Sequence, residues 1–175
     1  MKNNLFRLTF IVFYLPFLSF SQQAFTVHVV PSSITAAPAA HSGAFALRDG
    51  QWFFIGGRSD GMHIMQASQA FPVQLRNDSV FIVDPTANSY KAVSAKQLPG
   101  FLFEALCSAN MQFFQNDRYL YMIGGYGSED SSLTWITFPS LISIDLDCLL
   151  GAVHSGSSIT GCFRQIIDSN MAVTG

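Results

Sequence analysis

The stretch Trp52-Phe-Phe-Ile-Gly-Gly57 occurs a second time, in the same pattern, as Leu120-Tyr-Met-Ile-Gly-Gly125. Each copy is a short run of aromatic and aliphatic residues that ends in two glycines. Such a run is typical of a β-strand, and the glycines permit a sharp turn directly after it. Two copies in one chain indicate an internal repeat.

The sequence around both copies recurs in the same order. Upstream, a small polar pair opens a short apolar strand and a polar turn follows; downstream, a long polar loop leads to a hydrophobic strand that ends in aspartate. The matching segments are His41-Ser42 and Cys107-Ser108, Arg48-Asp49-Gly50 and Asn116-Asp117-Arg118, and Val80–Asp84 and Leu141–Asp145. Agreement at several separate landmarks indicates that residues 41–95 and 107–167 are equivalent units.

Strand signals dominate the chain beyond residue 21, whereas helical periodicity is weak. The expected strands are short, rich in aromatic or β-branched residues, and bounded by Gly, Pro, Asn, Asp or Ser. They are Phe25–Val30, Ala44–Leu47, Gln51–Ile55, Ser79–Val83, Tyr90–Ala95, Gln112–Gln115, Tyr119–Ile123, Leu141–Asp145 and Phe163–Ile167. The sequence therefore predicts an all-β fold.

Four segments of the first unit carry a family resemblance. They are Pro38-Ala-Ala-His-Ser-Gly43, Trp52–Gly57, Phe81-Ile-Val-Asp84-Pro85 and the aromatic Tyr90. This succession resembles the kelch repeat, in which Trp usually stands at the place of Tyr90.

The second unit matches the same repeat through Tyr119–Gly125 and Ile142–Asp145 and then departs from it. In place of the expected proline and aromatic residue it has an insertion that contains Cys148 and Cys162. The outer strand of this unit is therefore the part for which the repeat is the weakest guide.

The resemblance implies a β-propeller of kelch type, in which each unit forms one four-stranded antiparallel blade. Residues 41–95 and 107–167 would be two blades, residues 25–30 an outer strand of the kind that closes the ring, and residues 168–175 the start of a further blade. A propeller needs about 4–8 blades. We therefore expect an incomplete propeller of about two blades plus flanking strands.

Residues 1–21 have the layout of a secretory signal peptide. Lys2 and Arg7 form a basic start, the apolar run Leu8–Phe20 follows, and small residues precede Gln22. The apolar run is short for a membrane span. We expect cleavage after Ser21, no membrane span in residues 22–175, and a secreted, periplasmic or cell-surface protein.

Composition narrows the classes of partner. The chain is 49% hydrophobic, 14% aromatic and 11% charged, so it can bury enough apolar surface to fold. Its formal net charge is −2 and it has no Lys/Arg cluster, which argues against a nucleic-acid partner. The four histidines lie at no metal-ligand spacing, so no metal or other cofactor is expected.

The three cysteines leave two interpretations open. In an oxidising compartment Cys148 and Cys162 are candidates for a disulfide that closes a short loop, with Cys107 left over. Alternatively, all three are small buried hydrophobic residues.

The loops after the paired glycines are the best candidates for binding. Gly56, Gly57, Gly124 and Gly125 are expected to turn the chain where a Cβ would clash. Equivalent loops should leave both units on one face, and kelch propellers commonly bind partners there. The candidate binding residues are Arg58, Asp60, His63, Tyr126, Glu129 and Asp130, whose side chains suit polar recognition.

These expectations favour a non-catalytic exported propeller that binds a protein or a glycan through its loop face. No catalytic residue is assigned, because Ser42 and Ser108 lack a nucleophile setting. Two alternatives stay open: a propeller enzyme of the carbohydrate oxidase or sugar isomerase type, and a structural cell-surface protein.

Overall fold

The computed structural model describes residues 25–30, 34, 39–61, 72–130 and 134–173. By its internal contacts the chain divides into residues 1–32 and residues 33–175. All the helices and strands described below belong to the second unit.

The first repeat unit forms one four-stranded antiparallel sheet. Neighbouring strands in the chain are neighbours in the sheet, in the order β1-β2-β3-β4. The strands are β1 (Ala44–Arg48), β2 (Gln51–Ile55), β3 (Ser79–Asp84) and β4 (Ser89–Ser94). Each lies within one residue of the strand expected from the sequence, because alternating apolar residues and flanking turn residues define it.

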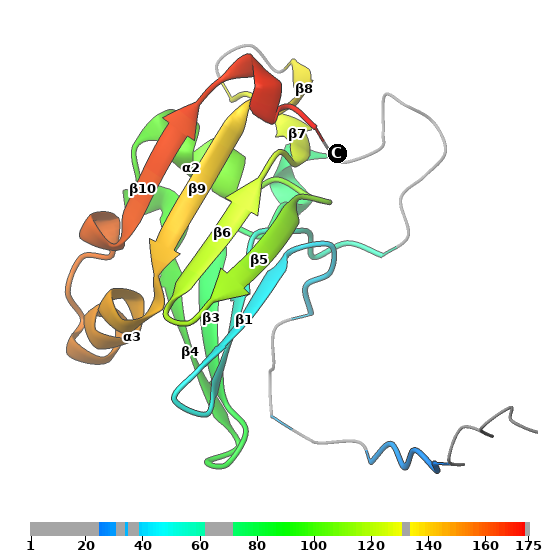
Figure 1. Cartoon of the computed structure of the whole chain (residues 1–175), viewed down its shortest axis with the longest axis vertical. Helices are drawn as coiled ribbons and strands as arrows, with labels where there is room; N and C mark the ends of the chain where they lie inside the picture. The colour runs from blue at the N-terminus through cyan, green and yellow to red at the C-terminus, as the bar shows by residue number, and fades with distance from the viewer. Residues whose placement is uncertain (1–24, 31–33, 35–38, 62–71, 131–133, 174–175) are drawn as a thin grey trace, which may run out of the picture. The chain divides into compact units, whose positions relative to one another are not determined.

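The second repeat unit forms another four-stranded antiparallel sheet, of order β10-β9-β6-β5 (Figure 1). Its strands are β5 (Gln112–Asn116), β6 (Tyr119–Ile123), β9 (Ser140–Asp145) and β10 (Phe163–Ile167). A short hairpin of β7 (Tyr126–Ser128) and β8 (Trp135–Thr137) stands between β6 and β9. The fold is mostly β, as predicted, and the two sheets are separate.

In the part of the chain that the structure describes, two α-helices lie outside the predicted pattern. The helix α2 (Gly100–Leu106) joins the two sheets, and α3 (Leu146–Ser155) occupies the insertion after β9. Asp145 caps α3, since its side chain accepts hydrogen bonds from the amides of Asp147 and Cys148. Gly156 ends the helix in the left-handed conformation, with φ of 71°.

The predicted strand Phe25–Val30 is not a strand in this structure. None of residues 25–30 is in a helix or strand, and all six are exposed. A β-strand exists only where a second strand pairs with it, and among the described residues none pairs with this segment.

One core lies between the two sheets. It takes Ala44, Ala46, Phe53 and Ile55 from the first sheet, and Leu120, Met122, Ile142 and Ile144 from the second. In each sheet these residues alternate along the strand, so they share one face. Strands β1 and β5 lie side by side where the sheets meet (Figure 1).

The opposite face of each sheet is open and rich in aromatic and aliphatic side chains. The first open face consists of Phe45, Leu47, Trp52, Phe54, Phe81 and Tyr90, all exposed or half-buried. The second open face consists of Phe114, Tyr121, Ile123, Leu141 and Ile166, again exposed or half-buried.

Polar contacts join the sheets at the end of the β1–β2 and β5–β6 turns. The Arg48 guanidinium donates to both carboxylate oxygens of Asp147, at 2.6 and 3.0 Å, and to Asp117 at 2.8 Å. The side chain of Gln115 accepts from the amide of Leu47 at 2.9 Å and donates to its carbonyl oxygen at 2.6 Å. These contacts fix one sheet against the other.

Candidate functional site

The paired glycines place both loops at one end of the sheet pair. All four have positive φ, from 67° at Gly56 to 95° at Gly125. A Cβ on Gly56 would overlap the carbonyl oxygen of Leu106. The amide of Gly57 donates to the carbonyl oxygen of Ser108 at 2.8 Å. The glycine turn of the first unit therefore packs directly against the opening of the second unit.

Arg58 and Asp60 form an internal pair behind this turn. The Arg58 guanidinium donates to Asp60 through Nε at 2.8 Å and Nη2 at 2.9 Å, and Nη2 also donates to the carbonyl oxygen of Pro72 at 2.9 Å. Arg58 is only 4% exposed, so it supports the loop from within. The Nε2 of His41 donates to the carbonyl oxygen of Asp60 at 2.7 Å.

Asp130 meets an arginine from the other repeat unit. The Arg76 guanidinium donates to the two carboxylate oxygens of Asp130 at 2.5 and 2.8 Å, and the same guanidinium lies 4.6 Å from the centre of the Phe103 ring. Because two parallel hydrogen bonds join the groups, such a pair fixes the orientation of the guanidinium and the carboxylate as well as the distance between them. It ties the loop after the first glycine pair to the loop after the second.

Tyr126 stacks on Trp135, with ring centres 5.9 Å apart and 21° between the ring planes. Both rings are half-buried. Together with Arg58, Arg76 and Glu104 they line a cavity of about 10 Å³, which has room for about one water molecule.

Of the remaining predicted residues, Glu129 belongs to the same loop, where its amide donates to the carbonyl oxygen of Thr134 at 3.0 Å. His63 lies outside the described residues. Five of the six predicted binding residues therefore stand at one end of the sheet pair, around the glycine turns. We call this surface the loop face, defined by Asp60, Arg76, Tyr126, Glu129, Asp130 and Trp135. The predicted residue Arg58 is buried beneath it and holds Asp60 in place.

Hydrogen bonds and burial shift the pKa values of the acids in this region in opposite directions. The hydrogen bond from Arg58 lowers the pKa of Asp60, and the hydrogen bond from Arg76 lowers the pKa of Asp130. Burial raises the pKa of Glu104, and the nearby charges of Asp130 and Glu129 add to that effect. Burial also raises the pKa of the Cys107 thiol to about 12, so this thiol stays protonated and inert near neutral pH.

Sequence reasoning missed Arg76, Glu104 and Trp135. Arg76 and Trp135 stand in the polar loops between the glycine turns and the next hydrophobic strands, and those loops were themselves predicted to matter. No sequence pattern indicated Glu104, because it lies on α2 and the sequence analysis did not predict that helix.

The Arg76–Asp130 pair predicts acid sensitivity. The pKa of Asp130 is lower in the folded state than in the unfolded state. Its stabilising effect is therefore complete above the unfolded pKa of about 3.9 and disappears as the pH falls through the folded value. We expect Asp130→Asn to lower the melting temperature at pH 7, and the difference from wild type to vanish near pH 2. Thermal unfolding monitored by circular dichroism from pH 7 to pH 2 measures this.

Two variants serve as controls for that series. Asp49→Asn should leave the melting temperature unchanged, because Asp49 is exposed and reaches Arg48 only at 3.9 Å. Glu104→Gln should raise the melting temperature at pH 7 and not at pH 3, since the pKa of Glu104 is raised. A constant deficit of Asp130→Asn at every pH would show that the ion pair does not cause it.

Among the described residues, no group of three or more His, Cys, Asp or Glu side chains is placed to hold a metal ion. Within the same part of the chain, no helix is both long and apolar enough to cross a membrane. Comparison with the models of known protein families found no match, and comparison with curated proteins found none either.

Proposed function

We propose that this chain is part of an exported kelch-type propeller that binds a protein or a glycan through its loop face, without catalysing a reaction. The sequence of residues 1–21 supports export. The disulfide between Cys148 and Cys162 agrees with an oxidising compartment.

The two open faces support the propeller. In the repeat, Phe53 and Ile55 correspond to Tyr121 and Ile123. Phe53 and Ile55 are buried against the second sheet, whereas their counterparts lie on the second open face. If the two units are equivalent, the second open face is the side that would pack against a third sheet. Likewise the first open face corresponds to the side of the second sheet that already packs against a neighbour. Exposed apolar side chains that gather on one face of a sheet commonly mark a contact surface.

The loop face supports a binding role. The single observation that carries the proposal is the pairing of Arg76 with Asp130 across the two repeat units. It brings the loops after both glycine turns together into one surface and holds them there. A preorganised surface loses less conformational freedom when it binds a partner.

The side chains on this surface suit a polar partner. Tyr126 and Trp135 offer half-buried rings, and Glu129 and Asp130 contribute carboxylates. Aromatic rings beside polar groups provide contact area to either a sugar ring or a protein loop.

The proposal is tested with purified residues 22–175 on a glycan array and against a phage-displayed library of protein domains. We expect saturable binding in one of the two formats, with at least about tenfold weaker binding for Trp135→Ala and for Arg76→Ala. Thr86→Ala is the matched control, because it lies in the β3–β4 turn at the opposite end of the first sheet. Equal binding by all the variants would place the binding surface elsewhere and reject the loop face.

A further inference from the structure

An open groove of about 770 Å³ lies between the first sheet and the insertion of the second repeat unit. One wall is Lys91, Ala92 and Val93 of β4 together with Gln97, and the other is residues 152–158, which end α3 and follow it. The residues that line the groove include none of the paired glycines and none of the residues of the loop face.

The wall formed by β4 is the unpaired edge of a sheet. Strand β4 is last in the order β1-β2-β3-β4, so among the described residues it pairs only with β3. The amide of Ala95 donates to the carbonyl oxygen of Asp78 at 2.9 Å. Since hydrogen-bonded positions alternate along an antiparallel strand, Lys91 and Val93 face β3 with their backbone groups. The amide and carbonyl of Ala92 then point outward, along the groove.

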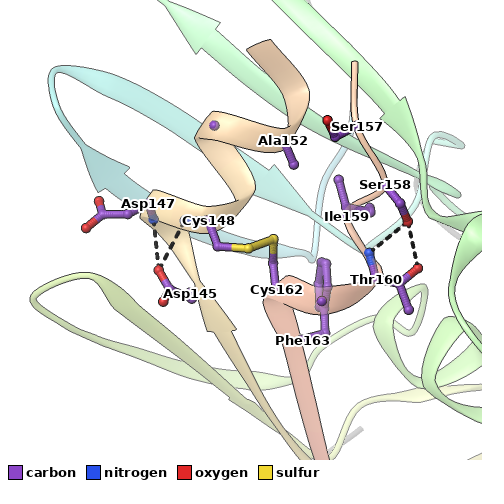
Figure 2. Close-up of a disulfide and its surroundings, with 12 residues drawn as sticks. Asp145, Asp147, Cys148, Ala152, Ser157, Ser158, Ile159, Thr160, Cys162 and Phe163 are labelled. Atoms are coloured by element: carbon purple, nitrogen blue, oxygen red, sulfur yellow. Dashed lines mark hydrogen bonds between the residues drawn. A yellow bond between two sulfur atoms is a disulfide. The ribbon is translucent and has the colours of Figure 1, made fainter. Parts of the chain in front are cut away.

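The opposite wall is held in place by covalent and polar contacts. The disulfide between Cys148 and Cys162 closes the insertion (Figure 2). The side-chain oxygen of Gln97 accepts from the amide of Ile159 at 3.0 Å and from the Ser158 hydroxyl at 3.1 Å. These contacts attach the insertion to the first sheet. The groove is therefore built by the segment that departs from the repeat.

The groove carries a charge preference. Lys91 and His154 line it, and none of its lining residues is acidic. Lys91 and Val93 pair with Ile82 and Val80, which are buried in the core, so the side chains of Lys91 and Val93 point to the α3 side of the sheet. A strand added beside β4 would present alternate side chains to these two residues.

We propose that this groove binds an extended peptide, which adds to the first sheet as an antiparallel fifth strand beside β4. The outward amide and carbonyl of Ala92 supply the backbone hydrogen bonds. The peptide places an acidic residue beside Lys91 and a small apolar residue beside Val93. Because an antiparallel strand runs in reverse, the apolar residue precedes the acidic one by two positions. This inference does not depend on the function proposed for the loop face.

The test uses fluorescein-labelled Thr-Val-Thr-Asp-Thr, with blocked ends, in a polarisation titration against residues 22–175. A second probe, Thr-Val-Thr-Lys-Thr, has the opposite charge. We expect saturable binding of the acidic probe below about 1 mM and binding of the basic probe at least about tenfold weaker. Lys91→Glu should reverse that order, whereas Lys96→Glu should not, since Lys96 is paired with Asp78 outside the groove.

Ala92→Pro and Ser157→Trp test separately whether binding needs the backbone of β4 and whether it needs the open groove. Ala92→Pro removes the outward amide and should weaken the acidic probe about tenfold. Ile167→Pro, at an outward position of β10, an edge strand of the second sheet, is its matched control and should bind like wild type. Ser157→Trp fills the groove from the exposed side and tests the same site without touching β4, should Ala92→Pro fail to fold.

Two results of these titrations would overturn the proposal. It is overturned if neither probe binds saturably, or if the acidic probe binds equally well to wild type, Lys91→Glu and Ser157→Trp. Circular dichroism of each variant accompanies the titrations, so that loss of binding is read only from folded protein.

Discussion

Gly56→Val is expected to leave no folded protein. Gly56 has φ of 67°, a conformation that is costly for any residue with a Cβ and most costly for a β-branched one. In addition, a Cβ at this position would overlap the backbone oxygen of Leu106. The backbone of α2, to which Leu106 belongs, cannot move aside as a flexible side chain can. We expect a loss of more than about 4 kcal/mol, which is a large part of the stability of an ordinary domain.

A series of alanine variants separates the cost of the positive φ from the cost of the steric overlap. Gly57→Ala should suffer both backbone strain and steric overlap, because φ is 80° and the new Cβ would overlap the carbonyl oxygen of His41. Gly50→Ala meets strain alone, because φ is 72° and nothing lies within 4 Å of its Cβ. Gly61→Ala meets neither. The expected order of stability loss is Gly57→Ala, then Gly50→Ala at about 1 kcal/mol, then Gly61→Ala near zero.

Urea denaturation followed by tryptophan fluorescence measures this series, and the yield of soluble protein measures the effect of Gly56→Val and Gly124→Val. Gly124 has φ of 70°, so the second unit should respond as the first does. A normal soluble yield and normal folding of both valine variants would show that the paired glycines are not required for the turns. It would also remove the physical reason for treating the two units as equivalent.

The strands were predictable because their signal is local. Trp52–Ile55 and Tyr119–Ile123 combine alternation with flanking turn residues, and both stretches are strands in the structure. The helices were not predictable in the same way. The helix α2 begins at Gly100 directly after Pro99, and a Pro-Gly pair is typical of a turn. The helix α3 is apolar on several sides and only ten residues long.

The candidate site was predictable in its position but not in its pairing. The repeat placed the loops after both glycine pairs at one end, and five of the six expected residues are there. It did not indicate that Asp130 would meet Arg76, 54 residues away, or that Arg58 would be buried with Asp60. Such contacts depend on how two sheets pack, and a repeat offset carries no information about which side chains meet across them.

Loss of the disulfide is the second large effect that we expect. Cys148 and Cys162 are 14 residues apart, and closing a loop of this size stabilises a protein by about 3 kcal/mol. Cys148→Ser and Cys162→Ser should therefore each lower the free energy of unfolding by about that amount. Reductant should lower the wild-type value to that of the variants and leave the variants unchanged. Cys107 does not confound this measurement, because it is buried and unpaired by disulfide.

The residues that lose hydrogen-exchange protection should show whether the disulfide holds only the insertion in place or stabilises the whole fold. The insertion reaches the first sheet through Gln97, whose side chain contacts Ser158 and Ile159. If the disulfide holds that contact, hydrogen exchange in Cys148→Ser should rise at residues 95–98 and 152–162, while β1, β2 and β6 keep their protection. Gln97→Ala should reproduce the local rise with a much smaller loss of global stability. Uniform loss of protection in both sheets would mean that the disulfide stabilises the whole fold through the unfolded state, and that the wall beside β4 does not depend on it.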